Sequence, residues 1–298
     1  MKKILLSEVG PRDGFQNIPE FIPTETKLEI IESLIAAGLQ KIQLTSFVSP
    51  RVIPQLRDAA EICAVILPKF PNVNFFALTP NLRGVENAWS CGIRSVSYVI
   101  SVTESHNRAN INRSLDQSFE ELEYIRKAFP DIRIALDMDT AFDCPFEGIT
   151  PLSAALNYVA RGYALGIREF NLCDTIGAAT PDQVKSTFEA LVSQYPDVMF
   201  TAHIHDTRNA GILNTIAAIQ YGAREVQTSI GGLGGCPFAP GAAGNTATED
   251  LVYLLNRMGY DTGVDFDLLM EAARLTRSHV AGNYSSHHLN IAKEYCIH

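Results

Sequence analysis

The stretch TETKLEIIESLIAAGLQKIQLTSF, residues 24–47, holds a helix-like segment followed directly by a strand-like one. In residues 24–37 the apolar side chains recur every three or four positions; Thr24 suits the N-cap, and Gly38 suits the helix end. Residues 41–47 are short, rich in Ile, Leu, Thr and Phe, and typical of a strand. A helix that leads straight into a strand is the repeating unit of α/β folds.

The same alternation continues along the rest of the chain. The further predicted strands are residues 3–9, 72–78, 95–102, 131–139, 169–174, 199–206 and 225–231. The further predicted helices are residues 54–67, 82–91, 115–128, 151–165, 181–195, 209–221 and 248–258. Eight strands alternating with eight helices favour a closed (β/α)8 barrel, a TIM barrel, and no GxGxxG motif follows the first strand. We expect one catalytic domain, 1–298, in which residues 259–298 form a C-terminal helical extension packed on the barrel.

Composition excludes several classes of protein. The chain has 298 residues, of which 46% are hydrophobic and 19% charged, as in a folded chain with a sizeable core. The formal net charge of −9 argues against a nucleic-acid or anionic-membrane partner. No apolar run is long enough for a membrane span or a secretory leader. The six cysteines are scattered and form no CxxC pair, so we expect reduced thiols and a cytoplasmic location.

Polar residues at the predicted strand ends suggest a metal site. In a barrel the functional residues lie at the carboxyl ends of the strands. His203 and His205 are two residues apart at one strand end and should point the same way. Asp13 follows the first strand and Asn245 precedes the last helix, and both can offer oxygen ligands. A mixed nitrogen and oxygen set suits Mg²⁺ or Mn²⁺, with other divalent ions possible. The alternative for Asp13 and its neighbour Arg12 is an ordinary surface turn.

A second feature is the glycine-rich segment GGLGGCP at 231–237. Glycines around one cysteine favour a loop that lets the backbone approach a ligand. Cys236 is therefore a candidate acid or nucleophile, and a buried thiol is the alternative. Thr248, farther along, could cap the last helix of the barrel.

With these residues in view, the chain resembles the hydroxymethylglutaryl-CoA lyases, within the wider group of metal-dependent TIM-barrel lyases and Claisen-type synthases. The resemblance covers nearly the whole chain. Its motifs are EVGPRDGFQN at 8–17, TSFVSPRVIPQLRDA at 45–59, ANINRS at 109–114, CDTIGAATP at 173–181, HIHDT at 203–207 and GGLGGCPFAPGAAGNTATEDLVYLL at 231–255.

The resemblance implies a role for each matching residue. Asp13, His203, His205 and Asn245 match a divalent-metal site. Arg12 matches an arginine that holds the thioester carbonyl and its enolate, and Asp13 or His203 would be the base. Cys236 matches a loop cysteine that donates a proton.

Other positions match less specific parts of the pattern. Asp174 and Glu249 match acidic positions around the site, and Gln43 and Ser46 lie at the end of the second strand. Gln43 departs from the family pattern, which has glutamate there, so the local charge is less negative and the preferred substrate could differ. The weak candidates for CoA binding are Arg108, Asn110, Asn112 and Arg113, for which a solvated charged loop is the alternative.

The implied reaction is retro-Claisen cleavage of a 3-hydroxyacyl-CoA. With 3-hydroxy-3-methylglutaryl-CoA the products are acetyl-CoA and acetoacetate, and the resemblance also implies a homodimer. One alternative is a related lyase for another 3-hydroxydicarboxylic acyl-CoA, such as citramalyl-CoA, or a Claisen-type synthase. An alternative of another class is a non-catalytic acyl-CoA-binding scaffold, for which Gln43 is the only sign.

Overall fold

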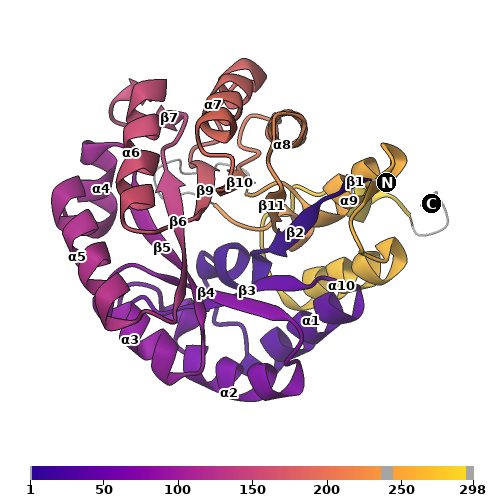
Figure 1. Ribbon diagram of the computed structural model, residues 1–298. Coiled ribbons are helices and arrows are strands. Elements are labelled where there is room, and N and C mark those ends of the chain that lie inside the picture. The colour runs from indigo at the N-terminus through magenta and orange to yellow at the C-terminus, as the bar shows by residue number, and fades with distance from the viewer. Residues whose placement is uncertain (1, 236–243, 293–298) are drawn as a thin grey trace.

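Eight parallel strands form a closed barrel in the computed structural model, which describes residues 2–235 and 244–292 (Figure 1). Around the barrel they are β2 (Leu5–Glu8), β3 (Lys41–Ser46), β4 (Asn74–Thr79), β5 (Ser95–Ser101), β6 (Arg133–Asp139), β9 (Glu169–Asp174), β10 (Met199–Ile204) and β11 (Glu225–Thr228). Neighbours in the sequence are neighbours in space, and β11 closes the ring on β2. The predicted TIM barrel is confirmed.

Helices form a ring outside the barrel (Figure 1). They are α1 (Thr24–Ala36), α2 (Ala59–Lys69), α3 (Leu82–Ser90), α4 (Glu104–Ile111), α5 (Leu115–Ala128), α6 (Leu152–Ala164), α7 (Pro181–Gln194), α8 (Gly211–Gln220) and α9 (Thr248–Arg257). Except for α4, which buries His106 and Asn107, each helix buries apolar side chains; in α1 these include Ile30, Ile31 and Leu34, which are fully buried. The hydrophobic core therefore lies between the barrel and its helices.

The start of α1 differs from the prediction. Thr24 is the first residue of the helix and not its N-cap, because Pro23 precedes it in an extended conformation. The Thr24 hydroxyl instead donates to Asp58 Oδ2 at 3.1 Å, so it serves a tertiary contact. The predicted end is correct: Gly38 has φ of +100°, which only glycine adopts at low cost, just after the helix.

Two further segments differ from their predictions. Residues 54–56 form a separate 3₁₀ turn, η2 (Pro54–Leu56), and α2 begins only at Ala59. Residues 104–111, for which no helix was predicted, form α4. Thr248 begins α9 without capping it, because its hydroxyl donates to Glu8 Oε2 at 2.6 Å.

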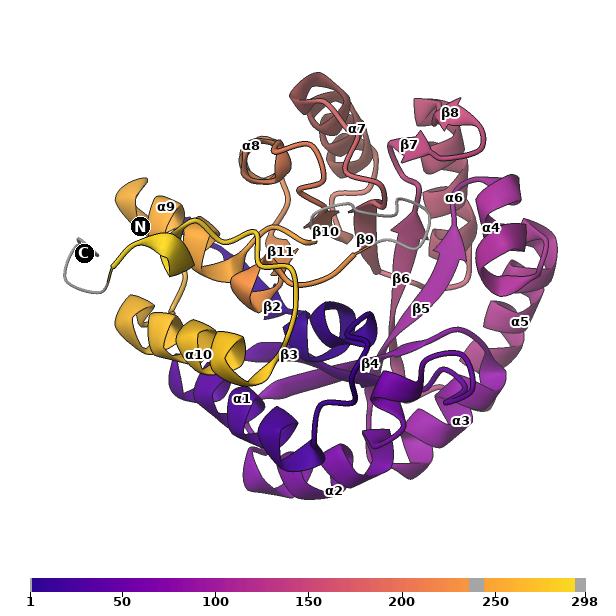
Figure 2. The same cartoon turned by 180° about the vertical axis from the view of Figure 1, so that it is seen from behind.

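The C-terminal segment lies beside the first strands of the barrel. A short strand, β12 (Tyr260–Asp261), pairs with β1 (Lys2–Lys3), and α10 (Phe266–His279) packs against α1. In Figure 2 the yellow chain then crosses over the barrel near β2 and β3. There Ser286 N donates to Gly231 O, in the 3₁₀ turn η3 (Ile230–Gly232) that follows β11. That the chain forms a single catalytic domain stays a prediction.

A hairpin and a short turn complete the described structure. The hairpin joins β7 (Asp143–Cys144) to β8 (Gly148–Ile149), between β6 and α6. The 3₁₀ turn η4 (His288–Asn290) lies in the C-terminal segment. Within residues 2–235 and 244–292, no helix is both long and apolar enough to cross a membrane.

Candidate metal centre and active-site pocket

A single π-helical turn, η1 (Gly10–Gly14), follows β2 and places two predicted site residues at the barrel mouth. The backbone N–H groups of Arg12 and Asp13 both donate to Val9 O, at 3.1 and 2.7 Å. Gly10 is required here, because a Cβ at this position would lie 2.6 Å from Glu8 Oε1. The turn buries Arg12 and Asp13, which are 7% and 5% exposed, so they do not form the alternative surface turn.

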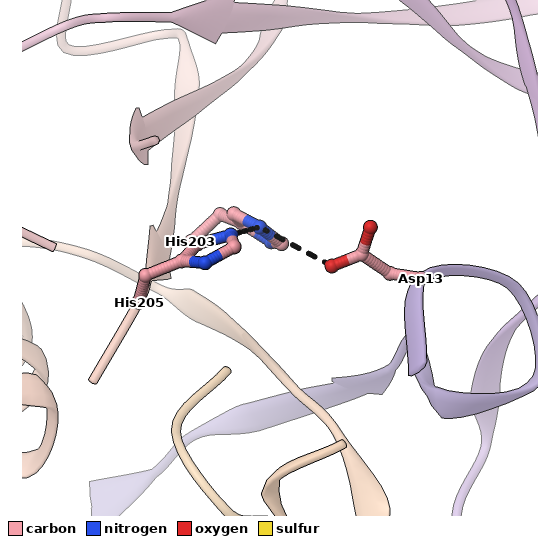
Figure 3. Close-up of side chains that lie close together, drawn as sticks. All are labelled: Asp13, His203 and His205. Atoms are coloured by element: carbon pink, nitrogen blue, oxygen red, sulfur yellow. Dashed lines mark hydrogen bonds and ion pairs between the residues drawn. The ribbon is translucent and has the colours of Figure 1, made fainter. Parts of the chain in front are cut away.

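The two histidines approach Asp13 from β10, which one strand, β11, separates from β2. Figure 3 shows the imidazoles of His203 and His205 pointing the same way, toward the Asp13 carboxylate. The two Nε2 atoms are 3.2 Å apart, and His203 Nε2 lies 3.9 Å from Asp13 Oδ2. His203 is in β10 and His205 directly follows that strand.

These three side chains have the geometry of a metal site. One ligand atom from each of Asp13, His203 and His205 lies within 4.8 Å of the others. Asn245 is fully buried; its Nδ2 donates to Asp13 Oδ2 at 2.6 Å, while its Oδ1 has no hydrogen-bond partner among the described residues. A buried amide oxygen without a partner costs free energy unless a ligand uses it. The set of two nitrogens and two oxygens therefore fits a divalent ion.

The imidazole of His203 has a defined tautomer. His203 Nδ1 lies 2.9 Å from Gln227 Oε1, and since an amide oxygen only accepts, Nδ1 carries the proton. Nε2 then has the free lone pair and faces Asp13. Burial, together with the neighbouring His205, lowers the pKa of His203 to about 4, so the ring is neutral at pH 7. A neutral imidazole with its lone pair directed inward is the form that binds metal ions.

Arg12 is fixed by two neighbours. Its Nε donates to Gln43 Oε1 at 2.5 Å, and its Nη1 donates to Asp13 Oδ1 at 2.6 Å. Burial acts to raise the pKa of Asp13, but the charge of Arg12, the two histidines and the hydrogen bond from Asn245 together hold that pKa below its usual range. Asp13 is therefore a carboxylate at neutral pH. Gln43 is fully buried, and its Nε2 has no partner among the described residues.

A cavity of about 390 Å³ opens beside this cluster. Its lining includes Arg12, Asp13, His203 and His205, and also Asn110 on α4. Arg12 lines the cavity and is bonded both to Asp13 and to Gln43 of β3. The arrangement can hold a cation and an oxyanion side by side in a site shielded from water.

The other predicted CoA-binding residues lie elsewhere. Arg108 is exposed on α4 and pairs with Glu104 at 2.7 Å. Asn112 ends α4 in the left-handed conformation, with φ of 55°. Arg113 pairs with Glu121, away from the cavity lining.

The remaining predicted residues support backbone around the site. Asp174 accepts from the N–H groups of Ala178 and Ala179, and burial raises its pKa to about 6. Glu249 accepts from Gly231 N at 3.0 Å, and burial raises its pKa to about 7. Ser46 accepts from the N–H of residue 48 at 3.1 Å. Cys236 lies outside the described residues.

The pocket residues that were not predicted from the sequence include Gln227, Asp137 and Asp139. The two aspartates had a usable signal, because Asp-Met-Asp at 137–139 ends a predicted strand with the same spacing as His203 and His205. Gln227 is one polar residue in a strand, and nothing in its local sequence marks it as the partner of a histidine.

Comparison with known proteins supports the same assignment. Residues 3–276 match the HMGL-like family. The hydroxymethylglutaryl-CoA lyase YngG of Bacillus subtilis is 40% identical over 294 residues, 98% of each chain. The human mitochondrial hydroxymethylglutaryl-CoA lyase is 41% identical over 274 residues, 91% of this chain and 84% of the human one.

Solved structures agree with the sequence relatives. The structure of the B. subtilis HMG-CoA lyase superposes with a TM-score of 0.92 at 40% identity, covering 97% of this chain and 98% of that one. An HMG-CoA lyase from Acinetobacter baumannii, solved with coenzyme A and 3-methylmalate, gives 0.93 at 35% identity, covering 99% and 97%. The barrel, the buried histidine and aspartate cluster and these relatives together show that the chain is a lyase and belongs to the hydroxymethylglutaryl-CoA lyase family.

Proposed function

We propose that this enzyme cleaves 3-hydroxy-3-methylglutaryl-CoA to acetyl-CoA and acetoacetate. The observation that carries the proposal is the buried cluster of Asp13, His203 and His205, with Arg12 paired to Asp13 at the mouth of the barrel. In the reaction the hydroxyl at C3 loses its proton, the bond between C2 and C3 breaks, and C2 takes up a proton. No other reactant is needed.

We assign the metal site to Asp13, His203, His205 and Asn245. A divalent ion, Mg²⁺ or Mn²⁺, would lower the pKa of a bound hydroxyl and neutralise a nearby carboxylate. The neutral tautomer of His203, held by Gln227, and the ionised state of Asp13, held by Arg12, both favour this role.

The chain's own residues supply the remaining chemistry. Arg12 has donors left over after its bonds to Gln43 and Asp13, and we assign them to the thioester oxygen, where negative charge develops as the enolate forms. We assign removal of the hydroxyl proton to Asp13 or His203, whose Oδ2 and Nε2 atoms lie 3.9 Å apart at the cavity. The proton donor to C2 is assigned to Cys236 on the family resemblance alone.

Other predicted residues are assigned to binding the rest of the substrate and to supporting the site. Asn110 is the one predicted CoA-binding residue that lines the described cavity. Asp174 and Glu249 are assigned to positioning the backbone around the site. A homodimer and a cytoplasmic location are proposed from the family resemblance and from the scattered cysteines.

Gln43 favours one second candidate, a lyase for another 3-hydroxydicarboxylic acyl-CoA. Its amide nitrogen is buried without a partner beside Arg12, whereas a glutamate there would add a second carboxylate next to the guanidinium. The charge around Arg12 therefore differs from the family pattern, which bears on the acid group the site prefers.

One experiment tests the proposal. Acetoacetate formation from 3-hydroxy-3-methylglutaryl-CoA is measured with Mg²⁺ or Mn²⁺, before and after chelation, for the wild type and Gln43→Glu. Asp116→Asn is the matched control, because Asp116 is 83% exposed and distant from the cavity lining. We expect metal-dependent product from the wild type and the control.

The other outcomes decide between the alternatives. Product only from Gln43→Glu would reject the named substrate and support the second candidate. Thermal stabilisation by the acyl-CoA with no product, even with metal, would support a non-catalytic scaffold.

A further inference from the structure

Two carboxyl groups in the active-site cavity have no part in the mechanism above. Asp137 and Asp139 are both in β6, and both line the cavity. Being two residues apart in a strand, they point to the same side, into the barrel. One strand, β9, separates them from β10, which carries His203.

Both carboxyl groups are held by neutral amides. Asp137, 5% exposed, accepts from Asn171 Nδ2 at 2.6 Å, and Asp139 accepts from Asn110 Nδ2 at 3.2 Å. A carboxylate has about four lone-pair sites, so each keeps acceptor capacity toward the cavity. Their side chains are therefore fixed by protein contacts but not saturated by them.

Neither carboxyl group has a cationic partner. Within residues 2–235 and 244–292, no lysine, arginine or histidine nitrogen forms an ion pair with Asp137 or Asp139. Burial raises the pKa of Asp137 to about 6 and that of Asp139 to about 7, and the charge of Asp137 contributes to the second shift. Carboxyl groups in such a site are costly to maintain without an ion pair, and a ligand that donates hydrogen bonds would lower this cost.

The surrounding charges indicate which donor fits. A carboxylate on the ligand would be repelled by the pair, and a methyl group would leave their oxygens without partners. The positive charge of Arg12 acts to lower the pKa of both Asp137 and Asp139, so its field reaches both groups. An ammonium group on the ligand would therefore be repelled by Arg12. A neutral hydroxyl meets neither objection, and it can donate to a carboxylate or accept from a protonated carboxyl.

We propose that Asp137 and Asp139 determine substrate specificity by binding a second hydroxyl group on the acyl arm, in addition to the hydroxyl at the carbon that is cleaved. This inference rests on the proposed retro-Claisen function and refines its substrate class. The preferred substrate is a polyhydroxylated 3-hydroxydicarboxylic acyl-CoA. Leu78, Val99 and Ile111 add apolar surface to the same cavity, and Asp137 and Asp139 are the carboxyl groups that β6 contributes to its lining.

The test compares two substrates that yield the same thioester product. One is 3-hydroxy-3-methylglutaryl-CoA, and the other carries a hydroxymethyl group in place of the methyl group. Cleavage between C2 and C3 gives acetyl-CoA from both, with acetoacetate or its 4-hydroxy derivative as the second product. We measure kcat/KM for each substrate in the wild type, Asp139→Ala, Asp139→Asn and the exposed control Asp116→Asn.

We expect the wild type and Asp116→Asn to prefer the hydroxymethyl substrate by about tenfold, the size of one hydrogen bond to a charged group. In Asp139→Ala the preference should fall to about one, through loss of activity on the hydroxymethyl substrate alone. Asp139→Asn, which keeps one acceptor oxygen, should lie between them. The ratio within one preparation does not depend on the fraction of folded enzyme, so a merely structural role of Asp139 would not change it.

The inference is overturned if the wild type shows no preference for the hydroxymethyl substrate, or if the same preference persists in Asp139→Ala. Cleavage of neither substrate would reject the proposed function instead. Thermal shift with each acyl-CoA would then decide the inference separately. Greater stabilisation by the hydroxymethyl compound, lost in Asp139→Ala, would support it, and equal stabilisation would refute it.

Discussion

The bond between Gln227 and His203 should determine how tightly the site binds a divalent ion. In the structure Gln227 Oε1 accepts from His203 Nδ1 at 2.9 Å, and both residues are at most 6% exposed. Replacing Gln227 by leucine removes the acceptor and leaves the Nδ1 proton buried without a partner. The imidazole is then free to place its proton on Nε2, the nitrogen that faces Asp13.

The size of the effect follows from two costs. Losing a buried neutral hydrogen bond costs about 0.5–1.5 kcal/mol, and an unsatisfied buried donor costs about 1–3 kcal/mol. With partial relaxation we take about 1.5–3 kcal/mol, which corresponds to about 10- to 100-fold in the dissociation constant of the ion. Gln227→Glu keeps an acceptor oxygen and should bind the ion at least as tightly as the wild type.

Isothermal titration of the purified protein with Mn²⁺ measures this directly. Thermal unfolding without metal provides the control for stability, since a misfolded variant would lose affinity for another reason. An unchanged dissociation constant in a folded Gln227→Leu protein would refute the reasoning, because it would mean that Nε2 of His203 is not a ligand or that its tautomer is fixed by another contact.

Three more predictions follow from buried polar contacts. Gln43→Leu should lower kcat/KM about 10- to 100-fold, because Arg12 Nε loses its hydrogen-bond acceptor, and Gln43→Glu should lower it less. Steady-state kinetics with a common substrate measures both values. Equal values of kcat/KM for the two variants would contradict this prediction. Asp58→Ala should lower the free energy of unfolding by about 3–5 kcal/mol, because it leaves the ammonium group of Lys27 buried without its partner. Lys27 is 1% exposed, and its Nζ lies 2.9 Å from both carboxylate oxygens of Asp58. Urea unfolding measures the loss, and a change below about 1 kcal/mol would contradict the prediction. Burial raises the pKa of Glu8 to about 7, so its folded state favours the protonated form, and the stability this provides is present below about pH 4.5 and lost as the pH rises through 7. Urea unfolding should therefore show the wild type losing stability between pH 5 and 7.5 relative to Glu8→Gln, and parallel curves would refute this.

The sequence predicted the barrel well because apolar periodicity is a local property. The strand over Glu169–Asp174 and the helix over Leu115–Ala128 have the bounds that their patterns indicate. Helix α4 was missed because its sequence, ESHNRANI, is polar and has few apolar residues to mark one face. It is held by tertiary contacts, such as Asn107 Oδ1 accepting from Ser101 N at 2.9 Å.

The site was predicted only in part because its contacts join distant parts of the chain. His203 and His205 could be recognised from their spacing in one strand. The bond from Asn245 to Asp13 spans 232 positions and depends on ring closure, which no local pattern reports. Distant contacts also explain why Thr24 and Thr248 do not cap their helices. Each residue suits an N-cap in its local sequence, but its hydroxyl donates a hydrogen bond to a buried carboxylate in another segment.

The barrel also explains why one spacing produces two different sites. His203 and His205 on β10, and Asp137 and Asp139 on β6, are pairs two residues apart, both lining the same cavity. The histidines are neutral and face the Asp13 carboxylate, so this part of the cavity attracts a cation. The aspartates face apolar side chains and Arg12, without a cation of their own. A substrate that satisfies both sides must present acidic oxygens toward β10 and a neutral donor toward β6. The chemical difference between the histidines of β10 and the aspartates of β6 therefore determines the orientation in which a substrate binds.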